Sequence, residues 1–344
     1  MIIKSQAVHA RVIALTMGEP AGISAEITLK AWLRRGEEVP VFCLIDDATR
    51  LRRLALDFGA EVEEVSTFAM AGEVWNRALP ILSHPLLVDP TLGSPDPRNG
   101  PVVVDAIARA VKLALNGEAS AVVTNPVHKA TLYNSGFKFP GHTEFLGALG
   151  GVPAPVMMLT CPGLRTVPVT IHVPLGRVSS FLTREAIVHC GRVTNAALRR
   201  DFGISAPRLA VAALNPHGGE QGAMGDEENQ IIAPAIKELR AAGITASGPV
   251  PADTLFHKQA RQTHDAVLCM YHDQALIPLK TLDFHRGINV SLGLPFVRTS
   301  PDHGTALDIA GCGVADADSL IAALRAAGEM AERRCSAERA SAVS

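Results

Sequence analysis

Three histidines each follow an apolar run of the sequence, at or just past the point where a strand would end. They are His172 after residues 167–171, His217 after residues 209–214 and His272 after residues 266–271. Neutral imidazole is the commonest nitrogen ligand of a divalent transition metal, and three imidazoles leave coordination positions open for a substrate oxygen. Asp273 directly follows His272 and could orient a ligating ring. This pattern predicts a catalytic metal site that favours zinc or cobalt over magnesium. The alternative is that each histidine only caps its strand.

A lysine, an amide and an arginine come next along the chain. Lys280, Asn289 and Arg298 stand on segments punctuated by glycine and proline. Beside a metal, these three side chains could hold a phosphate or a carboxylate. The alternative is a solvated loop with ordinary surface charges.

The usual sequence signature of a dinucleotide site is absent, because no G-x-G-x-x-G follows a predicted strand. The best candidate for a phosphate-binding turn is segment 215–228, whose backbone amides could approach a phosphate at the start of a helix. Its glycines are Gly218, Gly219, Gly222 and Gly225. Segment 16–23 is a similar turn. Tight strand-to-helix turns use glycine routinely, so both segments could also be purely structural.

The elements that must position these residues alternate along the chain. Short apolar or β-branched runs predict strands at 11–16, 41–45, 121–124, 156–159, 167–172, 209–214 and 266–271. Longer segments of helical period lie between them, which is typical of a mainly parallel sheet with helices on both faces. Ligands bind at the carboxyl ends of such strands, where the three histidines are expected.

Length and composition limit the class of protein. A chain of 344 residues is long enough for two α/β/α lobes around a cleft. With 47% hydrophobic and 19% charged residues and a net charge of -2, it predicts a globular protein with no nucleic-acid or membrane partner. Residues 1–11 lack the features of a signal peptide, which predicts a cytoplasmic protein. The six cysteines show no C-x-x-C spacing, so neither a zinc ribbon nor a disulfide framework is expected.

Several long segments, taken in order, closely resemble the 4-hydroxythreonine-4-phosphate dehydrogenase family of pyridoxal phosphate (vitamin B6) synthesis over nearly the whole chain. They are TMGEPAGIS from Thr16, VVTNPVHK from Val122, FPGHTEFLG from Phe139, TIHVPL from Thr170, LNPHGGEQGAMGDEE from Leu214, PADTLF from Pro251, MYHDQALIPLK from Met270, and GINVSLGLPFVRTSPDHGTALDIAG from Gly287. The departures from the family pattern are Glu19 for a common Asp, Ser24-Ala25 for Gly-Pro, and Asn125 and Ala275 for Gly.

The resemblance implies roles for specific residues. His172, His217 and His272 would bind the divalent metal (zinc, cobalt or magnesium), and His142, Thr143, Lys280, Asn289 and Arg298 would contact the phosphorylated substrate. Asp253 and Asp273 are candidates for a catalytic base or a ligand-orienting carboxylate. The resemblance also implies a homodimer whose active site takes residues from both subunits. The implied fold is similar to the isocitrate and isopropylmalate dehydrogenases. We expect residues 1–137 with 305–344 to form the first lobe, and residues 138–304 to form the second, carrying the metal and substrate residues.

The implied reaction is oxidation of the C3 hydroxyl of 4-phosphooxy-L-threonine by NAD or NADP. The product, 2-amino-3-oxo-4-phosphooxybutanoate, then loses carbon dioxide to give 3-amino-2-oxopropyl phosphate. A paralogous oxidoreductase acting on D-threonate or D-erythronate 4-phosphate is one alternative. A metal-dependent phosphate-ester hydrolase, which would need no dinucleotide, is a second, and a metabolite-binding protein without catalysis is a third.

Overall fold

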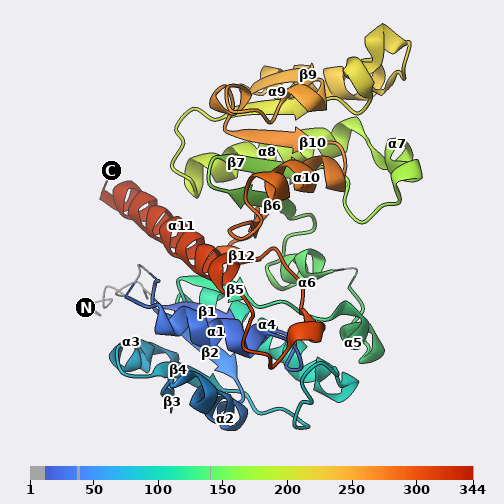
Figure 1. Ribbon diagram of the computed structural model, residues 1–344. Helices are drawn as coiled ribbons and strands as arrows, with labels where there is room; N and C mark the ends of the chain where they lie inside the picture. The colour runs from blue at the N-terminus through green and yellow to red at the C-terminus, as the bar shows by residue number, and fades with distance from the viewer. Residues whose placement is uncertain (1–11, 37–38, 140, 344) are drawn as a thin grey trace. The chain divides into compact units, whose positions relative to one another are not determined.

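The structure is a computed structural model that describes residues 12–36, 39–139 and 141–343. Its chain divides into two compact units, Met1–Pro153 with Leu294–Ser344, and Ala154–Gly293. Each unit combines a β-sheet with helices (Figure 1), so the predicted α/β class is confirmed.

The first unit contains a parallel sheet. In its described part the strand order is β3-β4-β2-β1-β5-β12, and every neighbouring pair is parallel. The strands are β1 (Ile13–Thr16), β2 (Phe42–Asp46), β3 (Val62–Glu64), β4 (Leu79–Ser83), β5 (Ala121–Thr124) and β12 (Arg298–Pro301). The carboxyl ends of β1, β5 and β12 therefore meet at one edge, which is where ligands bind in sheets of this kind.

Helices bury both faces of this sheet. They are α1 (Ser24–Leu33), α2 (Ala48–Phe58), α3 (Ala71–Val74), α4 (Gly100–Leu115), α5 (Lys129–Asn134), α6 (His142–Leu149) and α11 (Asp318–Val343), with short 3-10 turns η1 (Phe68–Met70), η2 (Pro97–Asn99) and η8 (Leu307–Ile309). Ala14 of β1 packs in the cluster built on α4, whereas the next residue, Leu15, is equally buried but lies outside that cluster. Successive strand residues point to opposite faces. Helix α11 packs along β12 and β5, and Thr299 donates a hydrogen bond to the Ala323 carbonyl across that contact.

The second unit has a mixed sheet in the order β11-β6-β7-β10-β8-β9. Its strands are β6 (Val156–Cys161), β7 (Leu164–Pro168), β8 (Arg208–Ala212), β9 (Thr245–Val250), β10 (Ala266–Cys269) and β11 (Ile288–Leu292). Strands β7, β10, β8 and β9 run parallel, whereas β6 pairs antiparallel with both β7 and β11. The two-residue turn at Pro162-Gly163 joins β6 to β7 as a hairpin.

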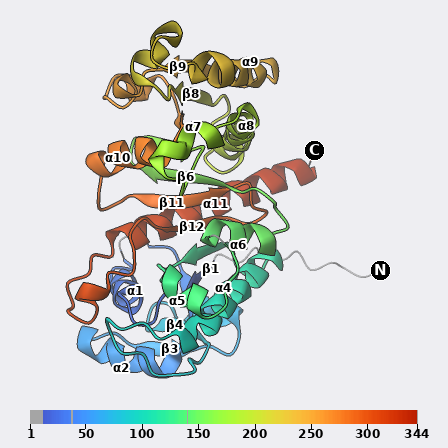
Figure 2. The same cartoon turned by 90° about the vertical axis from the view of Figure 1, so that its right-hand side faces the viewer.

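Helix α10 (His272–Leu282) buries Ala275 and Leu279 against β10 and β6. Helices α8 (Arg184–Arg200) and α9 (Ala233–Ala241) pack side by side (Figure 2) and contact β8 and β9. The other helical elements of this unit are short: α7 (Val178–Phe181), η3 (Leu175–Arg177), η4 (Pro216–Gly222), the π-helical turn η5 (Glu228–Ile232), η6 (Ala252–Thr254) and η7 (Ala260–Gln262). The segments that carry the three histidines thus follow the carboxyl ends of the parallel strands β7, β8 and β10.

The boundaries between the units differ from the predicted positions at 137/138 and 304/305. Helix α6 belongs to the first unit, because Phe145 and Leu146 pack in the hydrophobic cluster of α4. Strand β12 belongs there too, because Arg298 and Thr299 pair with β5. Both contacts are long-range, and local periodicity gives no sign of them.

No helix in the described ranges is both long enough and apolar enough to cross a membrane. The segment 1–11, on which the signal-peptide argument rested, lies outside the described residues, as does the first residue of the predicted strand 11–16. All six cysteines are free thiols.

Candidate active-site residues

Two of the three predicted metal-binding histidines lie together in the second unit. The ring centroids of His172 and His272 are 6.1 Å apart. His272 begins α10 directly after β10, and His172 follows the neighbouring parallel strand β7. Two imidazoles that share one ion through metal–nitrogen bonds of about 2.1 Å have ring centroids roughly 5 to 6 Å apart. The spacing of this pair is therefore close to that of two ligands of one metal.

Asp273 lies against the His272 ring. Its Oδ1 atom is 2.7 Å from His272 Nδ1. A carboxylate at this nitrogen holds the proton there, which leaves Nε2 as the lone-pair nitrogen available to a metal.

The third histidine lies on a backbone of unusual conformation. His217 is exposed in η4, where φ is positive at every residue from His217 to Gln221. His172 has the same φ of 52° as His217. Left-handed backbone at a non-glycine residue costs roughly 1 to 2 kcal/mol, and such strain is concentrated at functional sites. Two of the three histidines therefore share a conformation that packing alone would not favour.

Within the described ranges, no group of three or more His, Cys, Asp or Glu side chains lies close enough to hold a metal ion. The structure therefore brings His172 and His272 together without placing His217 beside them. The three-histidine site stays a prediction.

The glycine-rich turn has a structural explanation of its own. A Cβ atom on Gly219 would lie 2.6 Å from Glu228 Oε2, and one on Gly225 would lie 2.4 Å from Asn215 Nδ2. The buried Glu228 carboxylate accepts the backbone N–H groups of Leu214 and Asn215, both at 2.8 Å. Gly218 and Gly222 have positive φ values of 67° and 104°, which favour glycine. These contacts account for the four glycines without a ligand, and a dinucleotide site at this turn stays a prediction.

The other predicted residues of the second unit are more dispersed. Lys280 lies on α10 about 12 Å of helical rise beyond His272, and its ammonium is 5.5 Å from the centre of the Phe284 ring. Asn289 is half-buried on β11, and its Oδ1 atom has no hydrogen-bond partner among the described residues. Asp253 is exposed on η6.

The first unit holds a second set of predicted residues, around Arg298. Arg298 is only 3% exposed, donates to Thr124 Oγ1 at 2.6 Å, and has its Nη2 atom 3.5 Å from His142 Nδ1. Burial lowers the pKa of Arg298 to about 10. Burial, and then the positive charges of Arg298 and Lys129, lower the pKa of His142 to about 3. The cation therefore lies beside a neutral imidazole, and Thr143 is buried next to it in the first turn of α6.

The tautomer of His142 follows from this contact. A guanidinium can only donate hydrogen bonds, so the Nδ1 atom that faces it must be the acceptor and the proton must lie on Nε2. That Nε2 atom is buried and has no hydrogen-bond partner among the described residues. His142 thus offers a buried N–H donor beside a buried cation, a combination suited to an anion.

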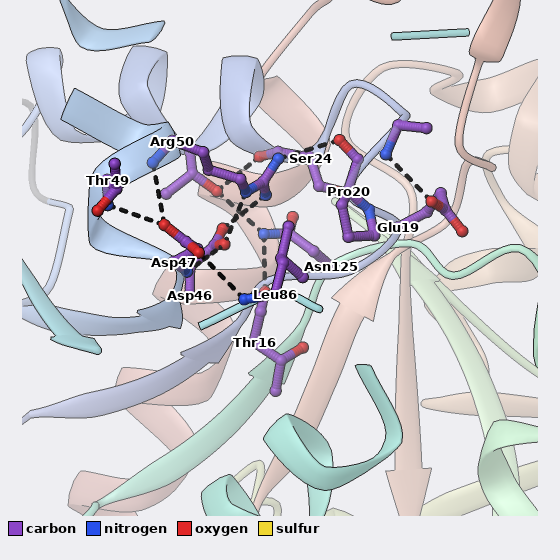
Figure 3. A network of polar contacts seen from close by, with 12 residues as sticks. Thr16, Glu19, Pro20, Ser24, Asp46, Asp47, Thr49, Arg50, Leu86 and Asn125 are labelled. Carbon is purple, nitrogen blue, oxygen red and sulfur yellow. Dashed lines mark hydrogen bonds and ion pairs between the residues drawn. The ribbon is translucent and has the colours of Figure 1, made fainter. Parts of the chain in front are cut away.

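A buried ion pair that the sequence analysis missed anchors the loop after β1 (Figure 3). Arg50 donates to both carboxylate oxygens of Asp46, at 2.9 and 2.8 Å, and to the Pro20 carbonyl at 3.0 Å. In the same loop, burial raises the pKa of Glu19, whose carboxylate accepts the Ala21 N–H. An i,i+4 Asp–Arg spacing at the start of a helix is the sequence signal that could have indicated the pair.

Two of the departures from the family pattern face each other around this loop. A Cβ atom on Gly18 would lie 2.5 Å from Ser24 Oγ and 2.7 Å from Asn125 Cβ. Asn125 also donates to the Thr16 carbonyl and to Thr28 Oγ1. Ser24 and Asn125 therefore close around a glycine that tolerates no side chain.

Comparison with known proteins agrees with the resemblance seen in the motifs. The family described as "Pyridoxal phosphate biosynthetic protein PdxA" matches residues 38–327. The chain is 53% identical to a 4-hydroxythreonine-4-phosphate dehydrogenase of Caulobacter vibrioides and 54% identical to one of Methylorubrum populi. The first alignment covers 94% of this chain and 98% of the relative, and the second covers 94% and 95%.

A crystal structure of the Klebsiella pneumoniae 4-hydroxythreonine-4-phosphate dehydrogenase superposes with a TM-score of 0.83 at 36% identity, over 94% of this chain and 100% of that one. Family, sequence relatives and fold agree over almost the full length. The chain therefore belongs to the PdxA family of pyridoxal phosphate biosynthetic proteins.

Proposed function

We propose that the protein oxidises the C3 hydroxyl of 4-phosphooxy-L-threonine with NAD or NADP, and that the keto acid formed loses carbon dioxide to give 3-amino-2-oxopropyl phosphate. Two relatives that are 53% and 54% identical to this chain are named 4-hydroxythreonine-4-phosphate dehydrogenase. The observation in the structure that carries the proposal is the His172–His272 pair, with Asp273 on the outer nitrogen of His272.

The residues present fit a divalent metal. His172 and His272 have the spacing of two ligands of one ion, and His217 is the proposed third. Their nitrogen donors favour zinc or cobalt, with magnesium a weaker match. When bound, the metal would stabilise negative charge on the substrate oxygen at C3, and the nicotinamide would accept the hydride.

The chain's own residues would bind and orient the substrate. Arg298 carries a charge that burial disfavours, as its lowered pKa shows, so an anionic group placed beside it would be strongly held. His142 would donate a hydrogen bond from its Nε2–H to the same anion without adding a second positive charge. Lys280 and Asn289 are also proposed to contact the substrate. Such contacts position C3 for hydride transfer.

A homodimer is proposed from the same family. Several apolar side chains of the second unit are exposed, among them Leu175 at 72%, Phe284 at 69% and Ile277 at 63%. Ile277 lies on α10, which also carries His272 and Lys280. A second copy of the chain covering this face of α10 would bury apolar surface beside the proposed ligands. The glycine-rich turn at Gly219 remains a proposed dinucleotide contact.

Absorbance at 340 nm tests the reaction directly. The protein is mixed with 4-phosphooxy-L-threonine and NAD or NADP before chelation, after chelation and after readdition of zinc, cobalt or magnesium. Formation of reduced cofactor that stops on chelation and returns with metal is the expected result. Turnover of D-threonate or D-erythronate 4-phosphate alone, or release of inorganic phosphate without a dinucleotide, would contradict the proposal.

Substitution of Lys280 by Ala tests the substrate contact from the second unit. A hydrogen bond to a charged group contributes about 1.5 to 3 kcal/mol, so KM should rise about 10- to 100-fold. Lys237→Ala is the matched control, because Lys237 is exposed on α9 of the same unit. Equal KM values for the two variants would remove Lys280 from the substrate site.

A further inference from the structure

The ladder between β10 and β8 ends just before the histidines. The paired residues run from Ala266 opposite Leu209 to Leu268 opposite Val211. Continued in the same register, the ladder would bring Met270 opposite Ala213. At that position the side chain of Gln274, from the first turn of α10, lies between the two strand ends.

The Gln274 carboxamide makes both hydrogen bonds that a backbone peptide would make there. Its Oε1 atom accepts the Met270 N–H at 2.6 Å, and its Nε2 atom donates to the Ala213 carbonyl at 2.8 Å. The side chain is 7% exposed. Buried backbone groups must be paired, so this amide satisfies one donor and one acceptor that the strands would otherwise leave open.

The same line of hydrogen bonds extends to the strands on either side. On one side, the hydroxyl of Thr170, just after β7, donates a hydrogen bond to the Met270 carbonyl at 2.7 Å. On the other side, the Ala213 N–H donates to the Val250 carbonyl of β9 at 2.8 Å. The chain leaves this line to reach His172 two residues after Thr170, His272 two residues after Met270, and His217 four residues after Ala213. The line therefore fixes the starting point of all three histidine-bearing segments.

An inserted amide also changes the spacing of the strands. One N–H···O=C hydrogen bond holds neighbouring strands about 4.8 Å apart. At Met270 and Ala213 the path contains two hydrogen bonds with a carboxamide between them, which is a longer connection than one direct hydrogen bond. Strands that diverge at their carboxyl ends open the space in which α/β proteins bind ligands.

We propose that Gln274 is a positioning residue for the metal site: its amide sets the separation and direction of the strand ends that carry His217 and His272. This inference rests on the proposed role of the histidines as metal ligands. Gln274 contacts both strand ends within one subunit. The inference therefore holds whether His217 and His272 bind one ion or the ions of two subunits.

Cobalt binding tests the inference without relying on activity. Co²⁺ is titrated into the metal-free full-length protein by calorimetry, and the visible absorption of the bound ion reports its coordination geometry. Gln274→Met keeps the length of the side chain but removes both hydrogen bonds. We expect cobalt affinity to fall about 10- to 100-fold, as for other residues that orient metal ligands, with an altered cobalt spectrum.

Thr166→Val is the matched control for loss of stability alone. Thr166 is buried on β7, and its hydroxyl donates to the Ala275 carbonyl of α10 at 3.2 Å, four residues before Thr170. This variant should lose one buried hydrogen bond between α10 and the sheet and bind cobalt like the wild type. Wild-type affinity and spectrum in Gln274→Met, or an equal loss of affinity in Thr166→Val, would overturn the positioning role.

A second variant covers the case in which Gln274→Met does not fold. Gln274→Glu, measured at pH 8.5, keeps the acceptor for Met270 but replaces the donor to Ala213 by a charged acceptor oxygen, and it should also bind cobalt more weakly. If neither variant folds, Gln274 is a folding requirement and the positioning role is rejected. The metal assignment has its own test. If the wild type binds no cobalt, or if the variants His217→Ala and His272→Ala bind cobalt as the wild type does, the proposed ligands are overturned whatever Gln274 does.

Discussion

Replacing Arg298 by Met should leave the ligand-free protein at least as stable as the wild type and make it a worse enzyme. Burial lowers the pKa of Arg298 from its ordinary 12.5 to about 10. A shift of this size corresponds to about 3 kcal/mol by which the folded state disfavours the charged form. Because the group stays protonated at neutral pH in both the folded and the unfolded chain, the whole of that penalty is present at pH 7. Methionine fills the same space without a charge.

The substitution also has a cost in stability. The hydrogen bond from Arg298 to Thr124 Oγ1 is lost, and a hydrogen bond from a charged group contributes about 1.5 to 3 kcal/mol. The net expectation lies between no change and a gain of about 1.5 kcal/mol in the free energy of unfolding without substrate, measured by urea denaturation. In the enzyme assay, loss of a buried charge that faces an anionic substrate should lower kcat/KM at least about 30-fold, equivalent to about 2 kcal/mol or more.

Arg98→Met is the control for this experiment. Arg98 is exposed and paired with Asp96 in the same unit, so its removal should leave both the free energy of unfolding and kcat/KM nearly unchanged. An Arg298→Met protein that is less stable than the wild type and has normal kcat/KM would refute the reasoning. Arg298 would then be a structural residue whose charge is well compensated.

Two further predictions concern buried polar groups of the first unit. The pKa of His142 is lowered from 6.5 to about 3, so below pH 6.5 the unfolded chain binds a proton that the folded protein excludes. Between pH 7.5 and pH 5, the free energy of unfolding of the wild type should therefore fall by about 2 kcal/mol more than that of His142→Gln, measured by urea denaturation. Equal falls in the two proteins would contradict the burial of a neutral His142. Asp46→Asn leaves the buried Arg50 cation without its carboxylate and should lower the free energy of unfolding by about 3 to 5 kcal/mol in the same assay. The double variant Asp46→Leu, Arg50→Met should lose less, because no buried charge remains. A single variant as stable as the double variant would show that the ion pair does not anchor the loop.

The positions of most strands could be predicted, because buried parallel strands are continuous apolar runs. The predicted strands at 121–124 and 266–271 correspond to β5 and β10, and the second overruns its strand by two residues. The predicted strand 167–172 corresponds to β7, which begins earlier, at Leu164, and ends at Pro168. The apolar pattern continues past the last regular pair, so sequence alone extended the strands up to the histidines.

The features that escaped prediction depend on contacts between distant segments. Gln274 has nothing in its local sequence to show that its amide meets Ala213, which is 61 residues away. Antiparallel pairing of β6 and the assignment of α6 to the first unit are long-range facts of the same kind. The adjacency of Asp273 and His272 was predictable, since the two residues are neighbours in sequence, whereas the distance from His172 to His272 was not.

The first unit is built from two separate stretches of the chain, and this affects how the protein folds during synthesis. Strand β5 ends at Thr124, but its partner β12 begins only at Arg298, and the whole of the second unit lies between them in the chain. At a synthesis rate of about 5 to 20 residues per second, β5 waits on the ribosome for roughly 10 to 35 s with one edge unpaired. An unpaired edge strand is a template for association with other chains. The second unit, which is continuous in sequence, can complete its sheet during that interval. Newly made first units are therefore the form of this protein with the greatest need of a chaperone.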